Sequence, residues 1–421
     1  GVAVITIPKD LGWQEIEDNY ISSANLYQKP LPLEPDSERI QQAWKILKEA
    51  KHPLIYIGQG TRGAREEVLA LSKMLQAPIL SSALAKGIVP DNAPAYMGSA
   101  GRVASKPGVE IASNTDAVLF LGSDMPFQSF FIPEDAKYIQ VDIDGTKFGR
   151  RHQVDLAILA DAKLTIKKLM EIGEQLPETA WYRAALADKE NWVEWLEKRS
   201  LIDSSPLEVE PVFKAINEMA TDDAISQVDV GNVTIDGMRL LDTSKNQRFT
   251  TSGWYATMGY ALPAAIGAKS QYPNRQVWSI SGDGAWAMVM PDILTQVKYH
   301  LPIINVVLTN KSLGFIEAEQ DDAKQPHSGI DLIGANFGAS AAALGAVGFD
   351  VNNLSELKEA FAKAKETDRP VVINVNIFDH RPLPVEQLKL DSSIYGEETV
   401  EAFEKEYQTQ GLIPFSKLIK E

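Results

Sequence analysis

The stretch Gly282-Asp283-Gly284, which 25 further residues separate from Asn310, decides the fold of this chain. Residues 276–281 (QVWSIS) form an apolar run typical of a buried strand, and residues 287–300 predict a helix. Residues 302–308 (PIINVVL) predict a second buried strand that ends just before Asn310. Ligands bind outside the carboxyl ends of the strands in open α/β sheets, so we expect both polar side chains to face one crevice.

This arrangement supplies hard oxygen ligands beside the N-terminus of a helix. Mg²⁺ prefers oxygen ligands in an octahedron and usually shares them with phosphate groups. The two glycines let the backbone approach an anion, and the helix offers it unpaired N–H groups. A bare Gly-Asp-Gly also occurs in an ordinary strand–helix turn, which is the alternative interpretation. The Asn310 that follows the second strand favours a Mg²⁺–phosphate site.

The composition is typical of a cytoplasmic enzyme. A length of 421 residues predicts two or three domains, and 44% hydrophobic residues are enough for sizeable cores. Lys and Arg number 41 against 57 Asp and Glu, a formal charge of −16 that argues against nucleic acid and anionic membranes as partners. The absence of cysteine excludes disulfides, thiolate catalysis and Cys-ligated zinc. No apolar run reaches the roughly 18 residues of a membrane span.

Strands alternate with helices in two blocks, 29–190 and 207–380, which predicts a doubly wound parallel sheet in each. A charged tail, 381–421, follows the second block. Residues 1–28 are interpreted as the remnant of a preceding domain and a linker. The chain lacks an initial Met, and Val2–Ile7 looks like a last strand, so we expect a fragment of a longer protein.

Three loops of the first block are candidates for binding a nucleotide. Gly58-Gln59-Gly60-Thr61-Arg62-Gly63 follows a predicted strand and matches G-x-G-x-x-G. Residues 80–84 contain no acidic partner for a ribose, so a tight strand–helix turn stays an equal alternative. Asp142-Ile143-Asp144 ends its own strand and is suited to a ribose or adenine contact. Gly98–Arg102 places an arginine in a loop of small residues, which suits a buried phosphate or a flavin edge.

The pattern around Asp283 resembles the thiamine diphosphate-binding motif of the thiamine-dependent decarboxylases and oxidases. The chain as a whole is similar to the phosphate-dependent bacterial pyruvate oxidases. In the first block, the similarity to their central FAD domain rests on residues 86–89, 98–103, 106–107, 122–127, 140–144 and 151–162. In the second block, it rests on residues 229–232, 256–259, 314–316, 381–384 and 390–391.

The resemblance implies a central FAD-binding domain followed by a thiamine diphosphate-binding domain. It implies that pyruvate, phosphate and O₂ become acetyl phosphate, CO₂ and H₂O₂, with thiamine diphosphate, Mg²⁺ and FAD as cofactors. It further implies a homo-oligomer, at least a dimer and by analogy a tetramer. In this superfamily, a Glu from an N-terminal pyrimidine-binding domain activates the cofactor. That domain is absent from this sequence, so we expect the chain alone to be inactive.

The resemblance also assigns roles to residues. Asp283, Asn310 and the backbone carbonyl of Ser312 match the metal ligands. The matched catalytic positions are Val230 beside the thiazolium, Met258 as an apolar wedge under the cofactor, Phe315 as a wall or electron-path neighbour, and Glu319 for a proton or phosphate. Cofactor contacts are expected at Gly231, Asn232, Met258, Gly282, Asp283, Gly284, Ala285 and Asn310 in the second block, and at Gly58, Gly60, Arg102, Gly122, Ser123, Asp142, Ile143, Asp161 and Ala162 in the first.

Two other classes of function stay open. One is a non-oxidative thiamine-dependent carboligase or decarboxylase, such as an acetolactate synthase-like enzyme, in which FAD is structural or absent. The other is a non-catalytic binding or assembly module. For single residues, ordinary core packing is the alternative for Met258, and a solvated helix face is the alternative for Glu319.

Overall fold

The computed structural model describes residues 4–19, 22–23, 26, 31–124, 131–380, 382 and 396–419. Several predicted motif positions, namely 125–127, 381, 383–384 and 390–391, lie outside the described residues. The chain divides into two compact units, residues 1–32 and 33–421.

The first unit contains a short 3-10 helix, η1 (Leu11–Trp13). Residues 4–7 do not form the predicted strand. Val4 and Ile5 are 84% and 82% exposed, and residues 4–7 pair with no strand in the part of the chain that the structure describes. A strand needs a neighbour for its backbone hydrogen bonds, which explains why the apolar pattern alone gave a wrong prediction here.

The second unit begins with a six-stranded parallel sheet in the order β3-β2-β1-β4-β5-β6. Its strands are β1 (Pro53–Ile57), β2 (Ile79–Ser81), β3 (Tyr96–Ser99), β4 (Ala117–Leu121), β5 (Lys137–Asp142) and β6 (Leu156–Leu159). Helices α1 (Ser37–Glu49), α2 (Arg65–Leu75) and α4 (Ala162–Ile172) cover one face, and α3 (Lys106–Asn114) and α5 (Ala180–Arg199) cover the other. This strand order is that of a doubly wound nucleotide-binding fold, as predicted.

A second six-stranded parallel sheet follows, in the order β11-β12-β10-β9-β7-β8. Its strands are β7 (Ile225–Val228), β8 (Arg248–Thr250), β9 (Val277–Gly282), β10 (Ile304–Thr309), β11 (Val347–Val351) and β12 (Val371–Asn376). One face packs on α6 (Val209–Met219), α7 (Asn232–Leu240) and α13 (Leu354–Lys365). The other packs on α8 (Ala261–Gln271), α9 (Asp283–Val289), α10 (Ile293–Lys298) and α12 (Phe337–Ala343). The predicted fold class is therefore confirmed.

The predicted helix over 287–300 is divided in the structure. α9 begins at Asp283, a 3-10 turn η6 (Met290–Asp292) follows, and α10 ends at Lys298. Pro291 lies in the 3-10 turn, where its missing N–H and fixed φ interrupt the hydrogen-bond ladder of the helix. The earlier helix start matters for function because it places Asp283 in the first turn of α9.

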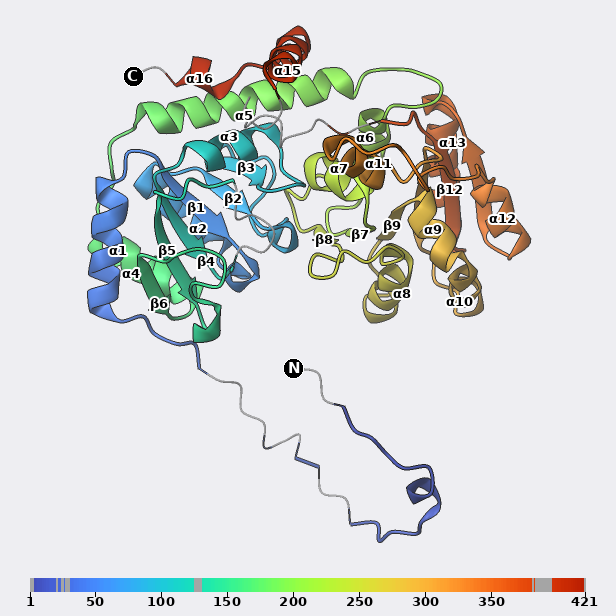
Figure 1. Ribbon diagram of the computed structural model, residues 1–421. Helices are drawn as coiled ribbons and strands as arrows, with labels where there is room; N and C mark the ends of the chain where they lie inside the picture. The colour runs from blue at the N-terminus through green and yellow to red at the C-terminus, as the bar shows by residue number, and fades with distance from the viewer. Residues whose placement is uncertain are drawn as a thin grey trace. The chain divides into compact units, whose positions relative to one another are not determined.

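Helix α5 links the two sheet domains and supports the end of the chain. Figure 1 shows α5 along the outer side of the first domain, with α15 (Glu397–Thr409) and α16 (Phe415–Leu418) against it. Trp192 and Trp195 of α5 pack on Tyr407 of α15. Below them, the ammonium group of Lys106 is fully buried and forms an ion pair with the equally buried Asp188. Among the described residues, no helix combines the length and apolar character that a bilayer span needs.

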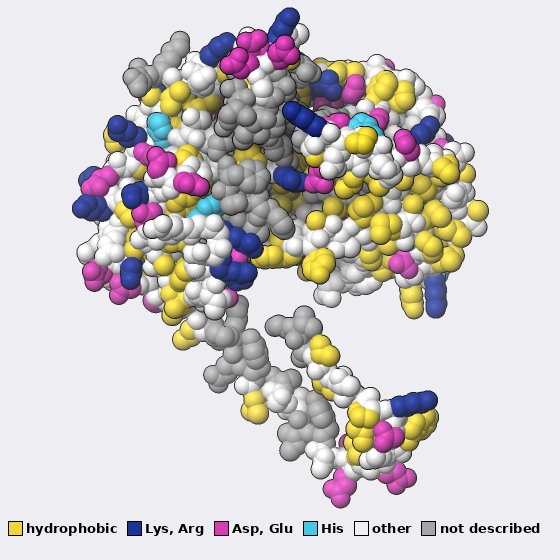
Figure 2. Space-filling model, viewed as in Figure 1, with side chains coloured by type: hydrophobic (Ala, Val, Ile, Leu, Met, Phe, Trp, Pro, Cys, Tyr) yellow, Lys and Arg dark blue, Asp and Glu magenta, His cyan; other side chains and the backbone are white. Residues whose placement is uncertain are grey.

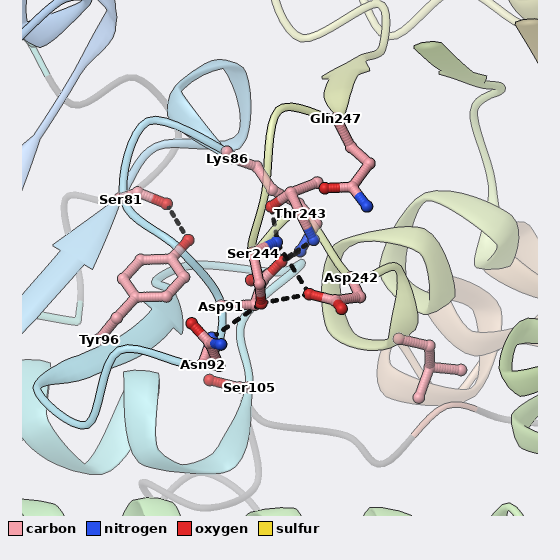
Figure 3. A network of polar contacts seen from close by, with 12 residues as sticks. Ser81, Lys86, Asp91, Asn92, Tyr96, Ser105, Asp242, Thr243, Ser244 and Gln247 are labelled. Carbon is pink, nitrogen blue, oxygen red and sulfur yellow. Dashed lines mark hydrogen bonds and ion pairs between the residues drawn. The ribbon is translucent and has the colours of Figure 1, made fainter. Parts of the chain in front are cut away.

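A polar network fixes the two sheet domains against each other (Figure 3). The buried Lys86 forms an ion pair with Asp91, 2.9 Å away in the same loop of the first domain. Asp91 Oδ2 also accepts hydrogen bonds from the backbone N–H and the hydroxyl of Thr243 in the second domain, at 2.7 and 2.6 Å. Ser244 Oγ accepts one from the backbone of Asn92 at 3.2 Å. The Asp91 carboxylate contacts Lys86 of its own domain and Thr243 of the other, so it fixes the position of the two facing edges.

Candidate active site

One cavity of about 750 Å³ is lined by residues of both sheet domains. Every site residue predicted in the second block lines it: Val230, Gly231, Asn232, Met258, Gly282, Asp283, Gly284, Ala285, Asn310, Ser312, Phe315 and Glu319. Four residues predicted in the first block line the same cavity: Arg102, Gly122, Ser123 and Asp142. The structure thus brings two groups of predicted residues, distant in sequence, to one space.

The Asp283 carboxylate sits at the carboxyl end of β9 and is nearly completely buried. Its Oδ1 accepts from the backbone N–H of Gly284 at 2.9 Å, and its Oδ2 from that of Lys311 at 2.8 Å. Burial raises the pKa of Asp283, while these backbone hydrogen bonds act in the opposite direction. The second bond ties the end of β9 to the residue after Asn310, so the two predicted metal ligands lie at one sheet edge, as expected.

The Asn310 side chain is oriented by a residue that the sequence reasoning missed. Its Nδ2 donates to Asp379 Oδ1 at 2.9 Å, and its Oδ1 accepts from the backbone of Ser312 at 3.4 Å. A carboxylate accepts but cannot donate, so Asp379 fixes which end of the amide carries the oxygen. Two oxygens at this edge, on Asp283 and Asn310, therefore have defined orientations.

These residues fit a Mg²⁺ ion bound together with a diphosphate. Among the described residues no group of three His, Asp, Glu or Cys side chains could hold a metal, so phosphate oxygens would have to complete the coordination. A Cβ atom added at Gly231 or Gly282 would meet nothing within 4 Å, which leaves open space at both positions. The φ of +133° at Gly231 also requires glycine. Side-chain oxygens beside an open glycine cradle suit this group.

Asp229 belongs to the quoted motif 229–232 but was not predicted as a site residue, and it organises the floor of the cavity. It is completely buried at the end of β7. Its Oδ1 accepts from the backbone N–H of Val230 at 2.9 Å and from Gly259 and Tyr260 at 2.9 and 3.3 Å. Its Oδ2 accepts from the backbone of Ala261 at 3.1 Å and from the hydroxyl of Ser281 at 3.2 Å. One carboxylate thereby joins β7, β9 and the turn that follows Met258.

Arg102, Phe315 and Glu319 meet where the two domains face each other across the cavity. Arg102 Nη1 forms an ion pair with Glu319 Oε1 on α11 (Gly314–Asp322). The Arg102 guanidinium carbon lies 6.0 Å from the centre of the Phe315 ring. The two charged side chains are 50% and 45% exposed, so solvent screens the pair and its contribution to stability is small. The ion pair matters for where it lies, because it spans the opening between the two domains.

The carboxyl ends of β4 and β5 form the first domain's side of the cavity. Gly122 has a φ of +62°, and Ser123 and Asp124 follow it into the lining. Burial raises the pKa of Asp142, whose Oδ1 accepts from the backbone of Asp144 at 2.9 Å. Gln59, Lys147 and Trp254 also line this cavity and were not predicted.

Gly58 and Gly60 do not line the cavity; close packing explains their identity. A Cβ on Gly58 would lie 2.1 Å from the carbonyl oxygen of Gly122, and one on Gly60 would lie 2.7 Å from its Cα. The glycine-rich segment also does not open a helix directly. The 3-10 turn η3 (Gln59–Thr61) comes first, and α2 begins at Arg65. The alternative of a tight strand–helix turn therefore fits Gly58 and Gly60 better than a phosphate cradle.

Ile143, Asp161 and Ala162 likewise lie outside the cavity lining. Ile143 is 69% exposed. Asp161 is the N-cap of α4, where its Oδ1 accepts from the backbone of Leu164 at 3.0 Å, and Ala162 is buried in the core beside it. Capping and packing account for Asp161 and Ala162 without a cofactor.

His380 and Asp236 form a buried pair that lines the cavity and was not predicted. His380 Nε2 lies 3.3 Å from the Asp236 carboxylate, and the His380 backbone oxygen accepts from Asn232 Nδ2 at 3.0 Å. Burial acts to lower the pKa of His380, but the charge and hydrogen bond of Asp236 raise it on balance. This pair anchors the segment after β12 to α7, next to the predicted cofactor contact Asn232.

The sequence of the chain matches two family models and several known proteins. Residues 229–375 match the thiamine pyrophosphate enzyme C-terminal TPP binding domain, and residues 40–169 match the thiamine pyrophosphate enzyme central domain. The chain is 42% identical over 427 residues to a pyruvate oxidase of Lactiplantibacillus plantarum, covering 100% of this chain and 71% of that protein.

Two further relatives extend the comparison. A putative thiamine pyrophosphate-containing protein of Bacillus subtilis, YdaP, is 36% identical over 388 residues, which cover 91% of this chain and 67% of that protein. An acetolactate synthase large subunit of Corynebacterium glutamicum is 29% identical over 398 residues, or 89% and 62% of the two chains. On these matches, this chain belongs to the thiamine pyrophosphate enzyme family.

Proposed function

We propose that this chain carries the flavin-binding and thiamine diphosphate-binding parts of an enzyme that oxidatively decarboxylates pyruvate. The products are acetyl phosphate, CO₂ and H₂O₂, and the co-substrates are phosphate and O₂. The observation that carries the proposal is the single cavity, which joins the Asp283–Asn310 edge of one sheet to the Gly122–Asp142 edge of the other. A thiamine cofactor and a flavin bound at these two edges would share one cavity, and direct electron transfer requires that they lie close together. The similarity to a pyruvate oxidase supports the choice of substrate.

The residues of the chain have defined tasks in this proposal. When bound, thiamine diphosphate supplies the nucleophilic carbon that pyruvate decarboxylation needs, and FAD supplies an electron acceptor. Asp283, Asn310 and the Ser312 carbonyl would hold Mg²⁺ against the diphosphate. Val230 and Met258 present apolar surface to the reacting atoms, and low polarity there favours the loss of charge that accompanies CO₂ release.

Arg102 and Glu319 provide the charges at the reacting end of the cavity. Pyruvate and phosphate are anions, and the chain carries a formal charge of −16, so a local cation has to attract them. Arg102 supplies that cation in the cavity, and Glu319 neutralises it in the absence of substrate. We propose that substrate competes with Glu319 for Arg102, which leaves the carboxylate to accept or donate a proton. Phe315 closes the apolar side of this region.

The proposal includes a homo-oligomer, at least a dimer and by analogy a tetramer, and a pyrimidine-binding domain that completes the site. Large apolar side chains are exposed on the second domain: Trp254, which lines the cavity, and Tyr255, Met288, Tyr299 and Ile333, at 58%, 89%, 63%, 61% and 94%. Figure 2 shows hydrophobic side chains gathered on the face of this domain. Such a face is typical of a surface that another domain or subunit covers.

The experiment is a product assay on the protein that carries a pyrimidine-binding domain together with this chain. Pyruvate, phosphate, thiamine diphosphate, Mg²⁺ and FAD are supplied, and O₂ uptake and acetyl phosphate are measured together. The proposal predicts equal amounts of both and neither in Asp283→Ala. Acetolactate formation without O₂ uptake would instead establish the carboligase alternative, which the similarity to an acetolactate synthase supports. The 421-residue chain alone is expected to show no turnover.

A further inference from the structure

A second cavity, of about 420 Å³, lies away from the proposed active site. Asp223, Arg248 and Arg275 stand at the amino-terminal ends of β7, β8 and β9, respectively, and all three line it. The proposed active site is at the opposite, carboxyl ends of the same strands. The first domain contributes Arg65, the first residue of α2, and Gly87. The cavity is therefore a separate feature that both domains build.

The lining of this cavity is strongly basic for a chain with a formal charge of −16. Three arginines, Arg65, Arg248 and Arg275, face a single carboxylate, Asp223, among the charged residues that line it. The Asp223 carboxylate is half exposed and lies 3.6 Å from Arg275 Nε. The neighbouring Lys245 forms an ion pair with Asp222, 2.5 Å away, so these two residues together add no net charge near the cavity. The excess of positive charge therefore comes from the three arginines that line the cavity.

Backbone carbonyls hold two of the guanidinium groups in fixed positions. Arg65 donates to the carbonyls of Gly87 and Ile88 at 2.8 Å each, and to that of Lys245 in the second domain at 3.1 Å. Arg275 donates to the carbonyls of Asp223 and Asn246. These bonds use only part of the five N–H donors on each guanidinium group. The guanidinium groups therefore keep further N–H donors, held in fixed positions, for a ligand.

Tyr272 brings two of the positive charges together. The guanidinium carbons of Arg248 and Arg275 lie 5.4 and 5.6 Å from the centre of its ring. Arg248 also donates to Tyr272 Oη at 3.3 Å, its one hydrogen bond from the side chain among the described residues. Burial and the charge of Arg248 both lower the pKa of Arg275. Like charges held this close gain most from a shared anion, because a bound anion offsets both the desolvation and the repulsion.

We propose that this arginine pocket, formed by Arg65, Arg248 and Arg275, binds a small phosphorylated metabolite through its phosphate oxygens. A volume of about 420 Å³ falls in the usual range for small-molecule sites, and planar guanidinium forks match phosphate geometry. Gly87 follows Lys86 of the network that joins the domains, and Gln247 of the lining lies in the same view (Figure 3). An anion bound here contacts both domains and stabilises their pairing. The proposal does not depend on the reaction assigned above.

The test is calorimetric titration of the 421-residue chain with inorganic pyrophosphate as the probe. EDTA and an Asp283→Ala background remove the competing Mg²⁺–diphosphate site. We expect saturable binding of one pyrophosphate, at least tenfold weaker in Arg248→Gln and unchanged in Arg183→Gln. Arg183 is an exposed arginine on α5 paired with Glu178 at 3.0 Å, so this control removes the same charge elsewhere. Absence of binding, or equal weakening in both variants, would overturn the proposal.

A second measurement separates a loss of ligand binding from a folding defect in the variant. Pyrophosphate should raise the thermal unfolding midpoint of the chain and of Arg183→Gln but leave that of Arg248→Gln unchanged, because ligand binding to the native state stabilises it. Arg248 is exposed at an edge strand, and its replacement leaves the carbonyl contacts of Arg65 and Arg275 intact. A midpoint shift of equal size in all three proteins would indicate nonspecific ion binding and would contradict the proposed site.

Discussion

Replacement of Asp229 by asparagine is the sharpest test of how the floor of the active-site cavity is built. The Asp229 carboxylate accepts five hydrogen bonds, three at Oδ1 and two at Oδ2. Asparagine has the same shape but only one oxygen. If that oxygen takes the Oδ1 position, the amide NH₂ faces the backbone N–H of Ala261, and two donors then oppose each other. Ser281 adapts, because its hydroxyl can accept instead.

The magnitude follows from these contacts. Hydrogen bonds to a charged group contribute about 1.5–3 kcal/mol each and those to a neutral group about 0.5–1.5, so three bonds lose about 1 kcal/mol each. The unsatisfied N–H of Ala261 adds about 1–3 kcal/mol. A neutral amide costs less to bury than a carboxylate, which offsets part of the loss. We expect Asp229→Asn to lower the free energy of unfolding by about 3 kcal/mol, a large share of the roughly 5–15 kcal/mol of a typical domain.

Urea unfolding of the 421-residue chain measures this difference, and Ser281→Ala is the matched control. The control removes one donor and leaves every backbone bond to Asp229, so it should cost no more than about 1 kcal/mol. The reasoning would be refuted if Asp229→Asn cost no more than Ser281→Ala. The turn after Met258 would then be held by other contacts, and Asp229 would not organise the cavity.

Three further predictions concern other parts of the molecule. Asp379→Ala should weaken Mg²⁺-dependent binding of thiamine diphosphate about tenfold, as tryptophan fluorescence would report, because it frees the Asn310 amide to rotate. Lys106→Met should lower the free energy of unfolding by about 3–5 kcal/mol, since it leaves its buried carboxylate partners unpaired; a loss below about 1 kcal/mol would contradict the ion pair. The difference in unfolding free energy between the native chain and Asp236→Asn should be largest below about pH 6.5. It should shrink as the pH rises through the raised pKa of His380, because the imidazole then loses its charge. A difference that does not change with pH would contradict a charged His380–Asp236 pair.

Much of the fold could be predicted because its strands are buried on both faces. Strands β9 and β10, for example, follow from the apolar runs 276–281 and 302–308, since a parallel sheet between helix layers makes such runs almost continuous. The helix after Gly282-Asp283-Gly284 was misjudged because the position of Pro291 was not used as a break. Residues 4–7 of the apolar run 2–7 form no strand in the structure, because sequence periodicity says nothing about whether a partner strand is present.

The site residues likewise divide into those that the sequence could predict and those that it could not. Asp283 and Asn310 could be found because a local motif with defined spacing places them at adjacent strand ends. Asp229 and Asp379 could not, because each acts through backbone or amide groups that come near only in the folded chain. For Gly58, the sequence left a phosphate site and a tight turn as equal alternatives, because close packing and close approach to a ligand favour the same residue type; the contact with Gly122 favours packing.

The most direct test of the central claim is the visible spectrum of the protein that carries a pyrimidine-binding domain together with this chain. Thiamine diphosphate, Mg²⁺ and FAD are bound, and the spectrum is recorded before and after pyruvate is added without O₂. If the Asp283 and Asp142 edges of the one cavity hold the two cofactors side by side, the oxidised flavin bands bleach when pyruvate is decarboxylated. A flavin that stays oxidised while CO₂ is released, or a protein that binds no flavin, would contradict the account and establish a non-oxidative enzyme.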